Sequence, residues 1–205
     1  MASNEISSLS FNEYYSVGGT SVTHDANGNL TNDGRFQYDW DGYNRLWRVR
    51  TLGGATVATY VYDTENRRVR KTLTGGATTD YLYDGWRVIE ERPVVSGVQG
   101  AAQRQLVYGN YLDEVLVADV DADADGDCAE SGTDTRTFYH QNTIYSVVAI
   151  TNASGDVVEA YAYDPYGKHV LLQDGDADGK VEFDASDTRI ALARPMHQVP
   201  EDSRL

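Results

Sequence analysis

The feature that most constrains the fold of this chain is a short turn motif that recurs along it. An aromatic residue or His precedes Asp, and Asn or Gly follows three positions after that Asp. The motif occurs as HDANGN from His24, WDGYNR from Trp40, YDTENR from Tyr62 and YDPYGK from Tyr163, with a shorter form, YDGWR, from Tyr83 and an Asn-based form, TNASGD, from Thr151. Such an internal repeat predicts that one local structure is built several times in succession.

Each copy of the motif is typical of a β-hairpin. Tyr60, Val61 and Tyr62 alternate before one turn, as expected for a strand that carries its aromatic side chains on one face. Asp suits the first turn position because its side chain accepts backbone N–H bonds, and Asn or Gly suits a left-handed residue. In three copies a basic residue, Arg45, Arg67 or Lys168, then begins the returning strand, where it can reach the preceding Asp or stack on a neighbouring ring. The predicted turn residues are Asp25, Gly28, Asp41, Asn44, Arg45, Asp63, Asn66, Arg67, Asp84, Asp164 and Gly167, and Lys168 takes the basic position in the last motif.

Consecutive hairpins predict an all-β fold. One hairpin is not stable alone, so its neighbours must pack beside it to bury the aromatic stripe. We therefore predict consecutive antiparallel β-hairpins in an extended, curved or spiralling sheet, with an ordinary β-sandwich as the alternative. Three segments are expected: a lead-in over residues 1–20, a hairpin region over 21–172 with an acidic insert at 119–135, and an acidic loop with an irregular tail over 173–205.

Charge is unevenly distributed along the 205 residues, whose formal net charge is -15. The segment from Arg35 to Arg92 contains 10 basic and 8 acidic residues, whereas the segment from Asp113 to Asp187 contains 3 basic and 18 acidic residues. Such an acidic surface repels phosphate backbones and attracts cations, so no nucleic-acid partner is expected.

Three further features limit the class of protein. The single cysteine, Cys128, excludes an internal disulfide framework. No apolar run approaches the length of a membrane span, so none is expected. Residues 1–16 lack the basic and apolar segments of a secretory signal, which indicates a protein that is cytoplasmic before export, or a fragment.

The segments YDWDGYNRLWRV, YDTENRRVRKT, YDPYGKHV and YGNYLDEVLVADVDADADGD resemble the YD repeats and associated core of the bacterial RHS proteins, related polymorphic toxins and animal teneurins. The resemblance implies a structural role, as a fragment of a β shell that encloses or presents a toxin in bacterial competition. It also implies partners, namely other RHS/YD-repeat segments or chains and a toxin cargo, and a secreted or cell-surface location within a larger system. The aromatic-rich later core segment of the family has no counterpart here, so a truncated member is expected and no autocleavage aspartate is assigned.

Two acidic runs resemble calcium loops. In DGDADGKVEFDA, three Asp residues occupy loop positions 1, 3 and 5, Gly179 occupies position 6, and Ala185 replaces the bidentate Glu of position 12. The alternative is that both runs are solvated loops between strands. The predicted calcium ligands are Asp174, Asp176, Asp178, Lys180 and Glu182 in one run, and Asp121, Asp123, Asp125 and Asp127 in the other.

Catalysis is not predicted by any motif in the chain. Its four histidines lack metal-ligand spacing, and Cys128 lies in an acidic run that disfavours its thiolate. We therefore expect a non-catalytic structural protein. The alternative is a cell-surface module that binds carbohydrate or protein, in which Trp40, Trp47 and Trp86 stack on a cell-surface glycan instead of packing in the sheet.

Overall fold

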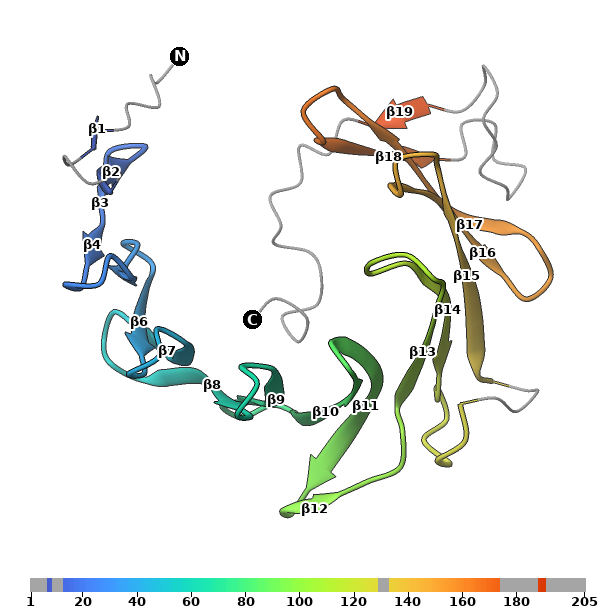
Figure 1. Ribbon diagram of the computed structural model, residues 1–205, viewed down its shortest axis with the longest axis horizontal. Helices are drawn as coiled ribbons and strands as arrows, with labels where there is room; N and C mark the ends of the chain where they lie inside the picture. The colour runs from blue at the N-terminus through green and yellow to red at the C-terminus, as the bar shows by residue number, and fades with distance from the viewer. Residues whose placement is uncertain (1–6, 9–12, 129–132, 174–187, 191–205) are drawn as a thin grey trace. The chain divides into compact units, whose positions relative to one another are not determined.

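The computed structural model describes residues 7–8, 13–128, 133–173 and 188–190, which form 19 β-strands and no helix (Figure 1). Every strand pair whose register is defined is antiparallel and joins strands that are close in sequence. The predicted all-β fold of consecutive antiparallel hairpins is therefore confirmed. Among the described residues, no helical segment has the length and apolar character of a membrane span.

The chain divides into two compact units between Asp80 and Tyr81. In the first unit, β1 to β3 form a small three-stranded sheet, and β4 to β10 pair in chain order as an antiparallel ladder. The strands are β1 (Ser7–Ser8), β2 (Tyr14–Val17), β3 (Thr20–Ser21), β4 (Thr23–His24), β5 (Leu30–Asn32), β6 (Phe36–Trp40), β7 (Leu46–Thr51), β8 (Thr56–Tyr62), β9 (Arg68–Leu73) and β10 (Thr78–Asp84), the last of which spans the boundary.

The second unit contains the remaining strands. There β11 pairs with β13, the strands from β13 to β19 pair in chain order, and β12 pairs with β11. The strands are β11 (Arg87–Val95), β12 (Val98–Gln99), β13 (Arg104–Tyr108), β14 (Val115–Val120), β15 (Thr135–Gln141), β16 (Val147–Asn152), β17 (Val157–Tyr163), β18 (His169–Gln173) and β19 (Thr188–Ile190).

One face of the first-unit ladder is apolar. Tyr38 lies opposite Val49, Val49 opposite Ala58, and Ala58 opposite Leu73, so their side chains share a face across four strands. Val49 and Ala58 are 0% exposed and Tyr60 is 6% exposed. The alternation in β8 thus buries the side chains of Ala58 and Tyr60 together, as a half-buried strand requires.

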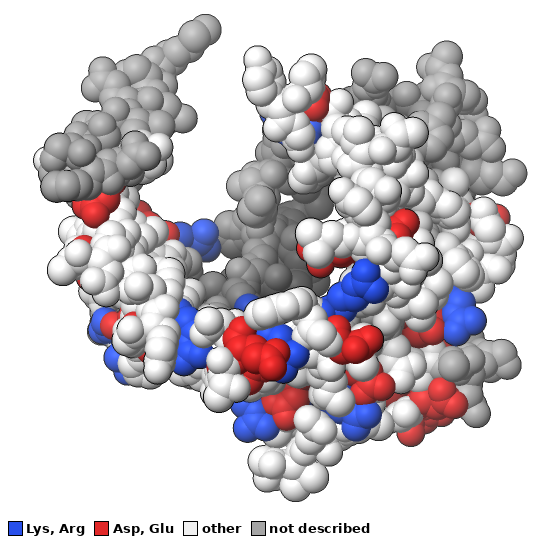
Figure 2. All heavy atoms as spheres, in the orientation of Figure 1, with Lys and Arg blue, Asp and Glu red and all other residues white. Residues whose placement is uncertain are grey.

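The opposite face carries ion pairs. Asp39 in β6 lies opposite Arg48 in β7, and its carboxylate accepts hydrogen bonds of 2.7 Å from Nε of both Arg48 and Arg50. The bond from Arg50 is the main cause that holds the pKa of Asp39 below its usual value, since burial alone would raise that pKa. On the surface seen in Figure 2, several Lys and Arg side chains lie next to Asp and Glu side chains.

The buried side chains of the second unit are mostly small. Val49, in the first unit, is the largest fully buried side chain among the described residues, and four of the six buried apolar residues described in the second unit are alanines. Small side chains bury little apolar area, so hydrogen bonds and ion pairs must supply more of the cohesion between hairpins. The buried apolar residues of this unit are Ala102, Ala118, Cys128, Ala149, Ala160 and Leu172.

The burial of Val49 on the apolar face is tested by a matched pair of valine substitutions in the first unit. Val49→Thr places a hydroxyl at a fully buried site and is expected to lower the free energy of unfolding by about 1–3 kcal/mol. Val61→Thr makes the same change where the side chain is 51% exposed, and is expected to stay within about 0.5 kcal/mol of wild type. Urea unfolding of both variants measures the difference, and equal losses would contradict the assignment of the apolar face.

Candidate functional site: the turns and an acidic cluster

Six five-residue turns share one hydrogen-bond pattern. The Oδ1 atom of the first residue accepts the backbone N–H groups of the third and fifth residues, with all twelve distances between 2.8 and 3.0 Å. One side chain thereby satisfies two backbone donors that would otherwise be unpaired in a tight turn. The first residues of these turns are Asp25, Asp41, Asp63, Asn142, Asn152 and Asp164.

The fourth residue of each turn has a left-handed backbone. Its N–H donates to the carbonyl of the first residue, and its φ lies between 60° and 90°. Gly and Asn adopt this conformation at low cost, which explains the Asn or Gly at this place in the sequence motif. The fourth residues are Gly28, Asn44, Asn66, Tyr145, Gly155 and Gly167.

Tyr145 is the exception at the fourth position. A bulky side chain is unusual at its φ of 62°. Its ring lies flat against the ring of Tyr111 in the preceding hairpin, with centroids 3.6 Å apart and planes 5° apart. This stacking contact offsets the backbone cost and joins two neighbouring turns.

The fifth residue pairs with the first. Arg45 and Arg67 each donate from Nε to Oδ2 of their own turn aspartate, Asp41 or Asp63, at 2.7 Å. Although partial burial opposes it, the hydrogen bonds from the backbone and guanidinium of the fifth residue hold the pKa of both carboxyls below the usual value. Asn29 plays the same part for Asp25, where its amide is the main cause of a lowered pKa of that carboxyl.

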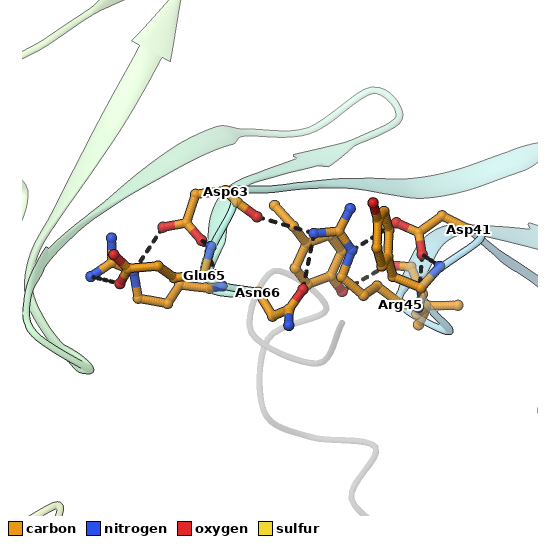
Figure 3. A network of polar contacts seen from close by, with 9 residues as sticks. Asp41, Arg45, Asp63, Glu65 and Asn66 are labelled. Carbon is orange, nitrogen blue, oxygen red and sulfur yellow. Dashed lines mark hydrogen bonds and ion pairs between the residues drawn. The ribbon is translucent and has the colours of Figure 1, made fainter.

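The fifth residue also reaches the next turn. Asn29 donates from Nδ2 to Oδ1 of Asn44 at 2.8 Å. One repeat further on, Arg45 donates from Nη1 to the carbonyl of Asp63 at 3.0 Å and to Oδ1 of Asn66 at 3.3 Å (Figure 3). The acceptor side chain in both cases is the left-handed Asn of the following turn. Three successive turns of the first unit are thus linked by side chains.

The aromatic residue before the turn makes a second link. The O–H of Tyr or the indole N–H of Trp donates to the carbonyl of the first or second residue of the returning strand of the preceding hairpin, at 2.6–2.9 Å. Phe cannot make this bond, so Tyr or Trp is required. Burial raises the pKa of the three tyrosine hydroxyls, which keeps them protonated as donors. The four pairs are Trp40 with Leu30, Tyr62 with Leu46, Tyr108 with Val88, and Tyr163 with Val147.

Arginine stacking accompanies two of these links. The guanidinium of Arg45 lies 5.0 Å from the ring centre of Tyr62, and that of Arg87 lies 5.4 Å from the ring centre of Tyr108. Arg87 also donates from Nη2 to the carbonyl of Tyr111 at 2.8 Å, as Arg45 does to Asp63. The same arrangement is therefore built in both units.

Several residues occupy places that the sequence did not indicate. Asp84 ends β10 and is followed by a two-residue turn at Gly85 and Trp86, so it does not begin a five-residue turn. Asp33 accepts the N–H groups of two following residues at 2.7 and 2.8 Å, and the Gly after it was the available signal. Asn142 was missed because Gln141 precedes it and Tyr145 stands where the other five turns of this pattern have Asn or Gly.

The tryptophans proposed for sugar stacking differ in their environments. Trp40 is half-buried, and its indole N–H donates to the Leu30 carbonyl at 2.8 Å. Trp47 is 38% exposed, with the guanidinium of Arg48 4.4 Å from its ring centre, and Trp86 is 70% exposed. Carbohydrate binding by the exposed rings stays a prediction.

The predicted calcium ligands separate into three groups. Asp174, Asp176, Asp178, Lys180 and Glu182 lie outside the described residues. Asp125 and Asp127 are exposed in the connection between β14 and β15. Asp121 and Asp123 come together with Asp134, which sequence reasoning missed, and the ligand atoms of these three residues lie within 4.8 Å of one another. We call Asp121, Asp123 and Asp134 the acidic cluster.

Known proteins resemble the chain over most of its length. No family model matches the sequence. Three curated relatives are similar over 168 residues: the tRNA3(Ser)-specific nuclease WapA of Bacillus spizizenii at 31% identity, the tRNA nuclease WapA of Bacillus subtilis strain 168 at 31%, and the tRNA(Glu)-specific nuclease WapA of Bacillus subtilis subsp. natto at 32%. Each match covers 80% of this chain, which spans 6% of the length of each relative.

A solved structure, "Crystal Structure of TcdB2-TccC3-TEV", aligns with 74% of this chain and 10% of that chain, with a TM-score of 0.40 and 11% identity. A likeness with so low a TM-score supports no conclusion about this chain.

The names of the relatives bear on the prediction of a non-catalytic protein. The prediction that this is not an enzyme is wrong, because the relatives are named nucleases.

The aromatic link is tested by removing one hydroxyl. Tyr62→Phe deletes the 2.8 Å bond to the Leu46 carbonyl and leaves that acceptor without its partner, so the free energy of unfolding is expected to fall by about 1–2 kcal/mol. Tyr166→Phe is the matched control, because its side chain is 96% exposed at a turn, and is expected to change stability by less than about 0.5 kcal/mol. If urea unfolding gave the same midpoint for Tyr62→Phe and wild type, the hydroxyl would not be a link.

Proposed function

We propose a scaffold role for this chain, which belongs to the RHS/YD-repeat family. Its hairpins form part of the repeat scaffold of a toxin protein that as a whole cleaves tRNA. The membership confirms the resemblance found in the sequence, and it is supported by 31% identity to the WapA of Bacillus subtilis strain 168 over 80% of this chain. The names of the relatives give tRNA as their substrate, and we propose the same substrate for the protein that contains this chain.

The repeated link between hairpins is the observation that supports a scaffold role. A long sheet of hairpins needs each unit to be fixed to its neighbour, and the same aromatic-to-carbonyl bond recurs four times in the described residues. These bonds join side chains to backbone within the sheet itself. The side chains of the motif thereby serve cohesion, and tRNA cleavage is attributed to the whole protein.

The proposal implies specific partners and a place of action. The scaffold contacts other repeat segments of the same protein and the toxin domain that it encloses or presents. A toxin of bacterial competition acts on another cell, so the protein is exported or held at the cell surface. The acidic character of the second half does not oppose this, since the scaffold is not proposed to contact the tRNA.

The proposal is tested in bacteria that produce the protein containing this chain, mixed with susceptible cells. Combining Tyr62→Phe with Tyr163→Phe removes two links, and is expected to reduce tRNA cleavage in the susceptible cells and to speed proteolysis of the repeat region. Cleavage of purified tRNA by the same variant protein is expected to match wild type, because the links do not belong to the nuclease.

Val61→Thr and Tyr166→Phe together are the control, since both side chains are exposed and neither makes a link. This control is expected to behave as wild type in both assays. Unchanged delivery and unchanged proteolysis in the link variant would contradict the scaffold role. Absence of tRNA cleavage by the wild-type protein in either assay would contradict the nuclease part of the proposal.

A further inference from the structure

The connection between β14 and β15 begins and ends with acidic residues that converge. Asp121 and Asp123 follow β14, Asp134 precedes β15, and one ligand oxygen from each lies within 4.8 Å of the others. Three carboxylates at this separation repel one another. Within residues 133–173 and 13–128, none of the three forms an ion pair, and the nearby Arg136 is already held by both oxygens of Asp119 at 2.6 and 2.8 Å.

The carboxylates of Asp121 and Asp134 are partly enclosed and accept backbone N–H groups, whereas Asp123 is exposed and accepts the Thr133 hydroxyl through Oδ2 at 2.7 Å. Asp121 is 9% exposed, and its two oxygens accept the N–H groups of Ala124 at 2.6 Å and Gly126 at 2.9 Å. Asp134 accepts the N–H of Ala122 through Oδ1 at 3.0 Å. Hydrogen bonds alone thus fix the cluster, and they leave its negative charge without a counter-ion in this part of the chain.

One oxygen of the cluster is left without any partner. Asp134 Oδ2 is enclosed by protein and makes no hydrogen bond with any described residue. Burying a carboxylate oxygen without a hydrogen bond, salt bridge or metal is costly, so such an atom indicates a missing ligand. This observation is independent of the loop pattern in the sequence, because Asp134 was not part of that pattern.

We propose that the acidic cluster binds a calcium ion through carboxylate oxygens of Asp121, Asp123 and Asp134. The ligand atoms that converge here among the described residues are all carboxylate oxygens, which favours a hard cation over zinc or copper. The nearby Cys128 is buried and donates from Sγ to the Ala102 carbonyl at 3.1 Å, so its thiol is already engaged in a hydrogen bond. An ion here joins the two ends of the connection and closes the loop between β14 and β15.

Calcium binding is a property beyond the proposed scaffold role. It stabilises the connection between β14 and β15 only where calcium is abundant, which is outside cells. Extracellular calcium modules with few carboxylates bind with dissociation constants of about 10⁻⁴–10⁻³ M. The ion would therefore be bound after export and largely absent inside the producing cell.

The test uses the full chain with Asp174→Asn and Asp176→Asn, which remove the other candidate calcium loop from the measurement. Thermal unfolding is followed in a chelator and in about 10 mM calcium, and binding to the native state is expected to raise Tm by about 3–10 °C. Titration calorimetry of the same protein is expected to show one site.

Adding Asp134→Asn to this background separates a metal site from a merely structural carboxylate. The amide keeps an acceptor for Ala122 but removes the charge, so Tm in chelator is expected to rise while the calcium response disappears. Asp113→Asn changes an exposed carboxylate in the connection between β13 and β14, outside both candidate calcium loops, and is the matched control that keeps the response.

Asp123→Asn is the second ligand variant and is expected to show the same loss of response if Asp134→Asn fails to fold. Equal melting curves in calcium and chelator for the background protein would overturn the proposal. So would a calcium response that survives in the ligand variants.

Discussion

The structure depends on the bond between an aromatic side chain of one hairpin and a backbone carbonyl of the hairpin before it. Backbone ladders alone join any two adjacent strands, but they fix neither the register nor the end of a hairpin. Tyr62, held at the Leu46 carbonyl, sets where its own turn lies against the preceding turn. Since the buried side chains are mostly small, this link and the arginine contacts carry a large share of the cohesion.

The sequence predicted the turns because their chemistry is local. Asp41, Asn44 and Arg45 act within five residues, and each has a residue-specific reason for its place. The links between hairpins were not predictable in the same way. Every residue offers a carbonyl, so no pattern marks Leu46 as the acceptor, and only the register of β7 and β8 brings it to Tyr62.

The same reasoning explains the other omissions. Asn142 was missed because Gln141 and Tyr145 replace the expected aromatic residue and Gly, and the stack of Tyr145 on Tyr111 is visible only in the fold. Asp134 lies beyond the acidic run in the sequence and is brought close to Asp121 and Asp123 only by the fold. No signal of the nuclease activity named for the relatives was present in the sequence, because this chain spans 6% of the length of each.

The central claim is that successive hairpins are coupled through their turn side chains, and native-state hydrogen exchange of Arg45→Ala tests it most directly. The account predicts faster exchange of the backbone amide at position 45 and also of the Asn66 and Arg67 amides, because the Arg45 side chain holds the following turn through Asp63 and Asn66. Faster exchange confined to residues 41–45, with the following turn protected as in wild type, would contradict it.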